Sequence, residues 1–189
     1  MAYEDFQTKE SVIIVYTGDN KGKTSAAMGL MTRALGNRWR VAVIQFIKYW
    51  GVGEHVFIRD IMPIYKDKLY FYKGGKGFYK AGEHSPQDIS DDQHKQAAQA
   101  TYDVAFAAAT SGEYDLVICD EINNAVHDGL VSHAQLVALL DSKAAGTSLC
   151  LTGRDFPLDL LGRVDIATEM KKLKHHFDDK YLANKGIDF

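Results

Sequence analysis

The chain has 189 residues, of which 46% are hydrophobic and 25% are charged, which suits one well-buried core and leaves little room for a second. Its 22 Lys and Arg residues against 25 Asp and Glu residues give a formal net charge of −3. This balance argues against a general nucleic-acid binder, because such proteins present a basic face to the phosphates. The first residues lack the apolar core of a signal peptide, and no apolar run approaches the ~20 residues that span a bilayer. Cys119 and Cys150 lie in apolar runs, which is typical of buried reduced thiols. We therefore expect residues 1–189 to form a single cytoplasmic domain, with neither a membrane nor a nucleic acid as partner.

Two short apolar strands with a helix between them open the predicted fold. Residues 12–16 and 41–46 are unbroken apolar runs rich in β-branched side chains, a pattern typical of strands buried on both faces of a parallel sheet. Residues 23–36 repeat apolar side chains at helical spacing and end at Gly36, a common helix stop. Residues 51–88 lack clear periodicity. We expect long loops there, with a short strand over residues 70–72.

The second half of the chain alternates helices and strands. Two helices are expected to begin at capping boxes, in which a Ser is followed three residues later by a Gln. These boxes are Ser90 with Gln93, before the alanine-rich residues 97–109, and Ser132 with Gln135. Strands are expected over residues 116–119 and 148–151. The alternation predicts an α/β fold with a parallel sheet.

The strongest local signal is a phosphate-binding loop between the first strand and the first helix. It reads Thr17-Gly18-Asp19-Asn20-Lys21-Gly22-Lys23-Thr24. Glycines let backbone N–H groups turn inward around a phosphate at the positive end of a helix. Lys23 supplies a mobile ammonium, and the Thr24 hydroxyl can ligate Mg²⁺. The spacing departs from the usual Gly-x-x-x-x-Gly-Lys-Ser/Thr pattern, because Thr17 stands where the first Gly is expected.

Charged residues follow two of the later strands. Asp120 and Glu121 end the run at residues 116–119, and a carboxylate at this place is the usual partner of a phosphate loop, on Mg²⁺ or its water. Arg154 follows the last strand and can clamp phosphate with its planar guanidinium. An ordinary solvated turn is the alternative interpretation at all three places. The residues expected to bind phosphate are Gly18, Asp19, Asn20, Lys21, Gly22, Lys23, Thr24, Ser25 and Arg154.

Taken together, these residues resemble a specific family, the P-loop type of ATP:corrinoid adenosyltransferase, which adenosylates cobalamin and its precursors. The phosphate loop of that family has the same compact spacing, with Thr at the first position. The resemblance runs from about Val12 to Phe189 and depends on the order of several short segments. These segments are Gln45-Phe46-Ile47-Lys48, Gly53-Glu54, Asp120-Glu121-Ile122-Asn123, Leu151-Thr152-Gly153-Arg154, Thr168-Glu169-Met170, Lys174-His175, Phe177-Asp178 and Lys185-Gly186-Ile187-Asp188-Phe189.

The resemblance implies a P-loop NTPase-like three-layer α/β fold with a mostly parallel central sheet, and a particular reaction. The family transfers the 5′-deoxyadenosyl group of ATP to a reduced Co(I) corrinoid and releases triphosphate. Because Co(I) is itself a strong nucleophile, the protein has to align cobalt with C5′ and stabilise the leaving triphosphate, with no need for a general base. The catalytic residues implied are Lys23, Thr24, Glu121 and Arg154, and those near Mg²⁺ (or Mn²⁺) are Thr24, Glu121 and Asp120.

The resemblance also implies how the corrinoid is held. The family packs aromatic side chains under the corrin to remove the axial ligand of cobalt, from a segment that reads Gly-Phe-Thr-Trp. The matching stretch here is Gly77-Phe78-Tyr79-Lys80, so Phe78 and Tyr79 are the expected corrinoid-binding residues. The chain departs from the family where Lys80 replaces the Trp.

A reducing flavoprotein as electron donor and a homodimer are further implications of the resemblance. Two other functions stay open from the sequence. One is a P-loop ATPase or phosphotransferase in which Glu121 acts on water or an acceptor hydroxyl, which would yield ADP. The other is a nucleotide-gated corrinoid-binding protein without catalysis. The seven histidines show no metal-ligand spacing, so we expect no zinc site.

Overall fold

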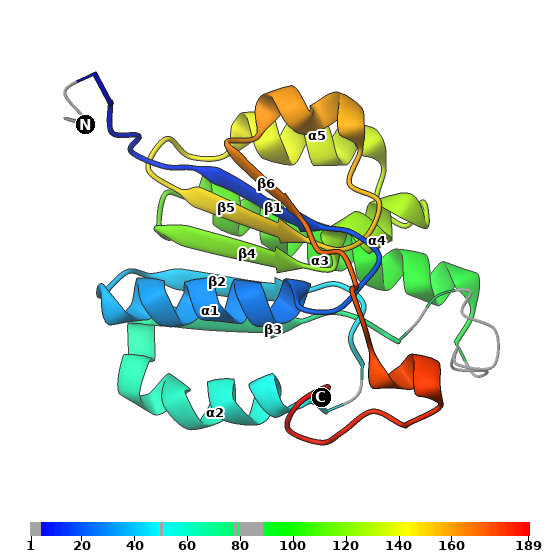
Figure 1. Cartoon of the computed structure of the whole chain (residues 1–189). Helices are drawn as coiled ribbons and strands as arrows, with labels where there is room; N and C mark the ends of the chain where they lie inside the picture. The colour runs from blue at the N-terminus through cyan, green and yellow to red at the C-terminus, as the bar shows by residue number, and fades with distance from the viewer. Residues whose placement is uncertain (1–4, 50, 78, 80–88) are drawn as a thin grey trace.

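A computed structural model describes residues 5–49, 51–77, 79 and 89–189, and this part of the chain forms a six-stranded sheet in the order β3-β2-β4-β5-β1-β6. The strands are β1 (Ile13–Thr17), β2 (Val41–Gln45), β3 (Leu69–Lys73), β4 (Leu116–Asp120), β5 (Ser148–Thr152) and β6 (Ile166–Glu169). All the described neighbours pair in parallel. The strands therefore point the same way, and their carboxyl ends meet at one edge of the sheet (Figure 1).

Helices cover both faces of the sheet, as Figure 1 shows. They are α1 (Lys23–Gly36), α2 (Gly53–Tyr65), α3 (Asp91–Thr110), α4 (Ile122–His127) and α5 (His133–Ser142), with 3-10 helices over Lys66–Lys68, Leu158–Arg163 and His176–Asp179. Within the described ranges, no helix combines the length and the apolar character that crossing a membrane requires.

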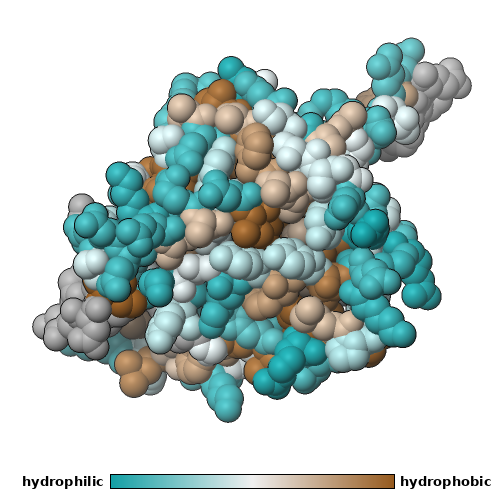
Figure 2. Space-filling model, turned by 180° about the vertical axis from the view of Figure 1, so that it is seen from behind, coloured by the Kyte–Doolittle hydropathy of each residue, from teal (hydrophilic) through white to brown (hydrophobic). Residues whose placement is uncertain are grey.

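Two layers of core lie on the two faces of the sheet, because successive residues of each strand point to opposite sides. In β2, Val41 and Val43 pack with α1 and with Ile58 of α2. Ala42 and Ile44 pack on the other face with α3 and α5. Seen from behind, hydrophilic residues cover most of the surface and hydrophobic ones lie in separate spots between them (Figure 2). The three-layer α/β fold expected from the sequence is confirmed, with a sheet that is parallel at each described pairing.

The local signals of the sequence are confirmed where they were strong. The first helix covers Lys23–Gly36 as expected, and both Ser-x-x-Gln capping boxes form. The five expected strands lie within one residue of their expected bounds, whereas β6 (Ile166–Glu169) was not expected from the sequence. Cys119 and Cys150 are buried free thiols, and burial followed by the nearby Asp120 charge raises the pKa of Cys119 to about 12, which makes it unreactive.

The expectation of long loops over residues 51–88 is wrong for much of that stretch. Gly53–Tyr65 forms α2, and Leu69–Lys73 forms the edge strand β3, longer than the expected residues 70–72. The helix lies on the rim of the sheet with only Ile58 fully buried, has no side-chain cap and carries Pro63 near its end. Ile58, Ile61 and Tyr65 recur at helical spacing and join the core layer that contains Leu69 of β3, so the helix carried an amphipathic pattern that the expectation of loops missed. Phe78, Lys80 and residues 81–88 lie outside the described residues.

Candidate functional site

The phosphate loop connects β1 to α1 at the carboxyl edge of the sheet. Gly18 and Gly22 have φ angles of 101° and 105°, a region that residues with a side chain rarely adopt. A Cβ atom on Gly18 would lie 2.6 Å from the carbonyl oxygen of Met170 and 2.9 Å from its nitrogen. Met170 in turn donates its N–H to Thr17 O at 2.8 Å. The loop is thus held against the chain that follows β6, and only a glycine fits at position 18.

Lys23 folds back over this loop. Its Nζ donates hydrogen bonds to Gly18 O and Asn20 O, both at 2.5 Å. Burial, and then the positive charge of Arg154, lower the pKa of Lys23. An ammonium that is partly desolvated and held by two carbonyl groups is ready to exchange them for phosphate oxygens.

The side chain of Asp120 is the centre of a buried polar network behind the loop, with no exposed surface. Its Oδ1 accepts hydrogen bonds from the hydroxyl groups of Thr24 at 3.0 Å and Thr152 at 2.7 Å. Its Oδ2 accepts from the amide of Gln45 at 3.0 Å and lies 3.4 Å from Lys48 Nζ. The carboxylate is therefore held in one orientation by four residues from three segments, namely α1, β5 and the end of β2 with the chain that follows it.

Gln45 connects Asp120 to His55 of α2. Because the Gln45 amide nitrogen donates to Asp120, its Oε1 is the acceptor at the other end, 2.6 Å from His55 Nε2. The imidazole must therefore carry a proton on Nε2. Burial, and then the charge of Lys73, lower the pKa of His55, so the ring is a neutral donor at neutral pH.

Lys48 follows β2 and reaches the same place. Its Nζ lies 2.7 Å from Glu54 Oε1 and 3.3 Å from Thr24 Oγ1, in addition to its contact with Asp120. Burial would lower the pKa of Lys48, but the carboxylates of Asp120 and Glu54 outweigh this effect and raise it. The ammonium of Lys48 is therefore charged, and it forms an ion pair with the buried Asp120 carboxylate.

Glu121 has an unusual backbone and a side-chain oxygen without a partner. Its φ of 65° and ψ of 19° place it in the left-handed region, and its N–H donates to Thr152 Oγ1 at 2.9 Å. Within the described part of the chain, its buried Oε2 has no hydrogen-bond partner. Burial and the neighbouring Asp120 charge raise the pKa of Glu121. Strained backbone and an unsatisfied buried oxygen are typical of a functional position.

The sequence analysis expects a divalent metal ion near Thr24, Asp120 and Glu121, and the structure allows the chemistry of these residues to be compared with that expectation. Oxygen ligands suit Mg²⁺, and the unpartnered Oε2 of Glu121 is an oxygen that a cation would satisfy. Among the described residues there is no group of three or more His, Cys, Asp or Glu side chains able to hold a metal. A metal ion here would therefore take ligands from phosphate and water, as Mg²⁺ commonly does.

Other predicted phosphate-binding residues are placed differently. Arg154 is exposed, and its backbone N–H donates to Asn124 Oδ1 at 2.7 Å; after burial, its charge helps to lower the pKa of Lys23. Lys21 points to the end of the chain and forms an ion pair with Asp188. The structure thus places Lys23 on the loop and gives Lys21 a different partner, while the printed contact of Arg154 is through its backbone N–H. Asp19 and Ser25 are exposed, and Asn20 is half-buried.

Of the predicted corrinoid-binding residues, Tyr79 is described and Phe78 is not. Tyr79 is half-buried and packs on the core layer that contains α3. Its ring centroid lies 5.4 Å from that of His94. Gly77, two residues earlier, donates its N–H to Ile47 O at 3.0 Å, so this segment returns to the carboxyl end of β2.

The sequence interpretation missed several members of the network. Gln45, Lys48 and Glu54 appeared there only as parts of matching segments, and Thr152 only as a neighbour of Arg154. A signal existed for Gln45, because a Gln inside an apolar strand is buried and needs partners. His55 carried no such signal, since it lies on a helix that the sequence did not predict.

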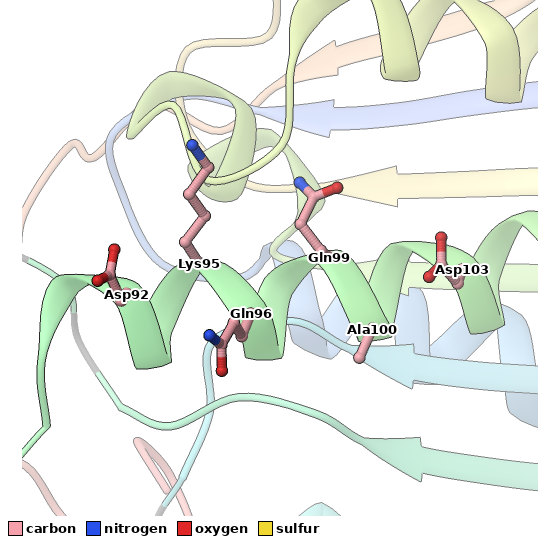
Figure 3. Close-up of a pocket in the computed structure, with 6 residues that line it drawn as sticks. All are labelled: Asp92, Lys95, Gln96, Gln99, Ala100 and Asp103. Atoms are coloured by element: carbon pink, nitrogen blue, oxygen red, sulfur yellow. The ribbon is translucent and has the colours of Figure 1, made fainter.

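A hollow of about 520 Å³ lies elsewhere, along the outer side of α3 (Figure 3). Its lining residues are Asp92, Lys95, Gln96, Gln99, Ala100 and Asp103. All six come from successive turns of one helix, and none belongs to the network around Asp120. We assign it no part in the site.

The comparisons with known proteins agree with this geometry. The model of the ATP:corrinoid adenosyltransferase BtuR/CobO/CobP family matches residues 9–189. A corrinoid adenosyltransferase of Pseudomonas aeruginosa is 30% identical over 182 residues, 96% of this chain and 85% of the relative. One of Escherichia coli K12 is 30% identical over 184 residues, 97% of this chain and 88% of the relative. Among solved structures, the flagellar accessory protein FlaH of Methanocaldococcus jannaschii shares the fold, with a TM-score of 0.51 at 13% identity over 85% of this chain and 71% of that chain. With the phosphate loop, the carboxylate pair and this match over nearly its whole length, the chain belongs to the ATP:corrinoid adenosyltransferase family.

Proposed function

We propose that the carboxyl edge of this sheet is where the chain transfers the 5′-deoxyadenosyl group of ATP to a reduced Co(I) corrinoid. The electron pair of Co(I) attacks C5′, the cobalt–carbon bond forms, and the bond from C5′ to the oxygen of the α-phosphate breaks. The Co(I) pair becomes the cobalt–carbon bond, triphosphate leaves with the electron pair of the broken C5′–O bond, and cobalt is formally oxidised from Co(I) to Co(III). No proton has to move, so the work left to the protein is alignment and charge stabilisation.

One observation carries the proposal for the nucleotide side. Lys23 and the buried network of Asp120 and Thr24 lie directly at the phosphate loop, in a chain that matches the family from residue 9 to residue 189. The amides of the loop and the Lys23 ammonium are suited to the triphosphate. Arg154 is suited to stabilise the charge that grows as triphosphate departs, because its guanidinium stays charged and its charge already acts on Lys23.

Thr24, Asp120 and Glu121 are the residues we propose to hold Mg²⁺ or Mn²⁺. Thr24 would ligate directly, and Glu121 would act directly or through water, with Asp120 keeping Thr24 in place. Such an ion supplies charge neutralisation on the triphosphate. The buried Glu121 Oε2, which has no partner in the described chain, supports this assignment.

On the corrinoid side, we propose that Tyr79 contributes an aromatic surface next to the carboxyl end of β2, together with Phe78. The half-buried position of Tyr79 against His94 supports a ring that is held in place rather than free in solvent. Residues 1–189 would act as one domain, in a cytoplasmic homodimer supplied with electrons by a flavoprotein.

The direct test is to incubate the chain with ATP, Mg²⁺ and chemically prepared Co(I) cobalamin and to follow the visible spectrum while measuring the phosphate products. We expect an alkylated corrinoid and triphosphate in equal amounts. Release of ADP without corrinoid would identify a P-loop ATPase instead. Binding of both ligands with neither product would identify a binding protein.

Glu121→Gln separates the two enzymatic readings. If Glu121 holds the metal, the variant needs more Mg²⁺ and transfers the adenosyl group more slowly. If Glu121 were a general base for hydrolysis, the variant would bind ATP normally and lose ADP formation alone.

A further inference from the structure

Lys48 is held by the same oxygens that the proposed metal ion would use. Its ammonium donates to Thr24 Oγ1 at 3.3 Å and lies 3.4 Å from Asp120 Oδ2. The Thr24 hydroxyl donates its own hydrogen bond to Asp120 Oδ1. The bond from Lys48 is therefore accepted by a lone pair of Thr24 Oγ1. A metal ligated by Thr24 needs a lone pair of that oxygen.

The surroundings of Lys48 are built for a cation. Its side chain is 12% exposed, and the side chains of Asp120 and Glu54 beside it are 0% and 19% exposed. A buried carboxylate such as Asp120 is costly without a compensating positive charge. Its other partners, Thr24, Thr152 and Gln45, are neutral donors. The hydrogen bonds to Asp120 bring no positive charge, so Lys48 supplies the charge that compensates this carboxylate.

A second cation within a few ångströms would be strongly repelled, because charges interact over short distances with little screening inside a protein. Glu54, at 2.7 Å from Lys48 Nζ, offers the ammonium an anchor that does not involve Thr24 or Asp120. Lys48 can thus leave the two metal-side residues without becoming an unpaired buried charge.

We propose that Lys48 is an exchangeable cation: it neutralises Asp120 in the ligand-free chain and leaves Thr24 and Asp120 when the divalent metal binds. The inference rests on the proposed function only in assigning the metal to Thr24, Asp120 and Glu121. Lys48 is a positioning residue in this scheme. It keeps the carboxylate and the hydroxyl in place before the metal arrives, and it sets how much metal is needed to displace it.

The test uses the full chain with Mn²⁺ and a fixed concentration of inorganic tripolyphosphate, which supplies the phosphate ligands of the metal, and with no nucleotide or corrinoid. Thermal unfolding is measured in chelator and over a range of Mn²⁺ concentrations for wild type, Lys48→Gln, Lys48→Arg and the control Lys73→Gln. Lys73 is exposed and donates to Tyr49 O, so its loss changes net charge equally without removing a hydrogen bond or ion pair of the network. In chelator, Lys48→Gln should unfold at a lower temperature than Lys73→Gln. Its half-saturating Mn²⁺ concentration should fall by about tenfold, while Lys48→Arg and Lys73→Gln should stay near wild type.

A measurement on the wild type keeps the proposal testable if Lys48→Gln does not fold. Lysines are acetylated briefly in chelator and in Mn²⁺, and the ratio of modification at Lys48 to that at Lys73 is read by mass spectrometry. The ratio should rise several-fold with Mn²⁺, because the amine has left its buried partners. An unchanged ratio, or an equal Mn²⁺ requirement in Lys48→Gln and Lys73→Gln, would overturn the exchange. A failure of the proposed function would appear separately, as the absence of adenosylated corrinoid from wild type in the spectral assay.

Discussion

Replacement of Gln45 by Met tests whether the buried network around Asp120 is held from the β2 side. Met has nearly the same length and shape, so Gln45→Met leaves no large cavity in the strand. It removes the donor to Asp120 Oδ2 at 3.0 Å and the acceptor for His55 Nε2 at 2.6 Å. Gln45 is 0% exposed, so water does not readily replace either hydrogen bond.

The size of the effect follows from these two hydrogen bonds. A hydrogen bond to a charged group contributes about 1.5–3 kcal/mol and a neutral one about 1 kcal/mol. Together they predict that the free energy of unfolding falls by roughly 2–4 kcal/mol, since partial relaxation recovers some of the loss. For a chain of this size, the unfolding midpoint should fall by about 4–16 °C. The Mg²⁺ concentration for half-maximal activity should rise by ~10–100-fold, because an outer partner of a metal-site carboxylate has been removed.

Gln99→Met is the matched control. Gln99 is a partly buried Gln of α3 that donates to Leu130 O at 2.7 Å and pairs with Gln135, outside the site. This variant should lose stability but keep the wild-type Mg²⁺ requirement. Urea unfolding and the spectral assay at varied Mg²⁺ measure both quantities. If Gln45→Met and Gln99→Met had the same Mg²⁺ requirement as wild type, the network would be structural only and our reasoning would be refuted.

Three further predictions follow from single contacts. Lys23→Ala should reduce turnover in the spectral assay by ~10²–10³-fold, because it removes a preorganised charge from the triphosphate site; near-normal turnover would exclude this role. Gly18→Ala should lower the free energy of unfolding, measured in urea, by at least ~1–2 kcal/mol, because its Cβ would lie 2.6 Å from Met170 O in a left-handed backbone. The control Gly29→Ala, which has open space around it, should leave stability unchanged or raise it. His55 has a folded-state pKa below the ordinary value of 6.5, first because of burial. The unfolded chain therefore takes up this proton first, so the contribution of His55 to stability is present above about pH 6.5 and is lost as pH falls below 6.5 through the folded-state pKa; urea unfolding of His55→Gln should show a shallower loss of stability below pH 6.5 than wild type.

The sequence by itself determined the elements whose signals are local. The phosphate loop, the helix Lys23–Gly36 and the two capping boxes depend on residues within a few positions of one another. Backbone hydrogen bonds and side-chain caps act over the same short range, so pattern and structure coincide. The run of short segments was also sufficient to indicate the family, which the match over residues 9–189 confirmed.

Local signals were insufficient where packing decides the outcome. Helix α2 begins without a side-chain cap and contains Pro63, so its ends carry no clear local signal, although Ile58, Ile61 and Tyr65 recur at helical spacing. Glu121 adopts a left-handed backbone because its N–H is held by Thr152, 31 residues away in sequence. Lys21 resembles the other phosphate-loop residues in sequence, yet the end of the chain supplies its partner, Asp188.

The network around Asp120 is the part that only the tertiary structure decided. In the parallel pairing of β2 with β4, Gln45 lies beside Asp120 although the two are 75 residues apart in sequence. Lys48 comes to the same carboxylate because it follows β2 at the same edge of the sheet. Asp120 carried a signal along the chain, but the sequence did not show that Gln45 and Lys48 would be its partners. Strand order and register bring them together, and burial then requires that their charges and hydrogen bonds satisfy one another.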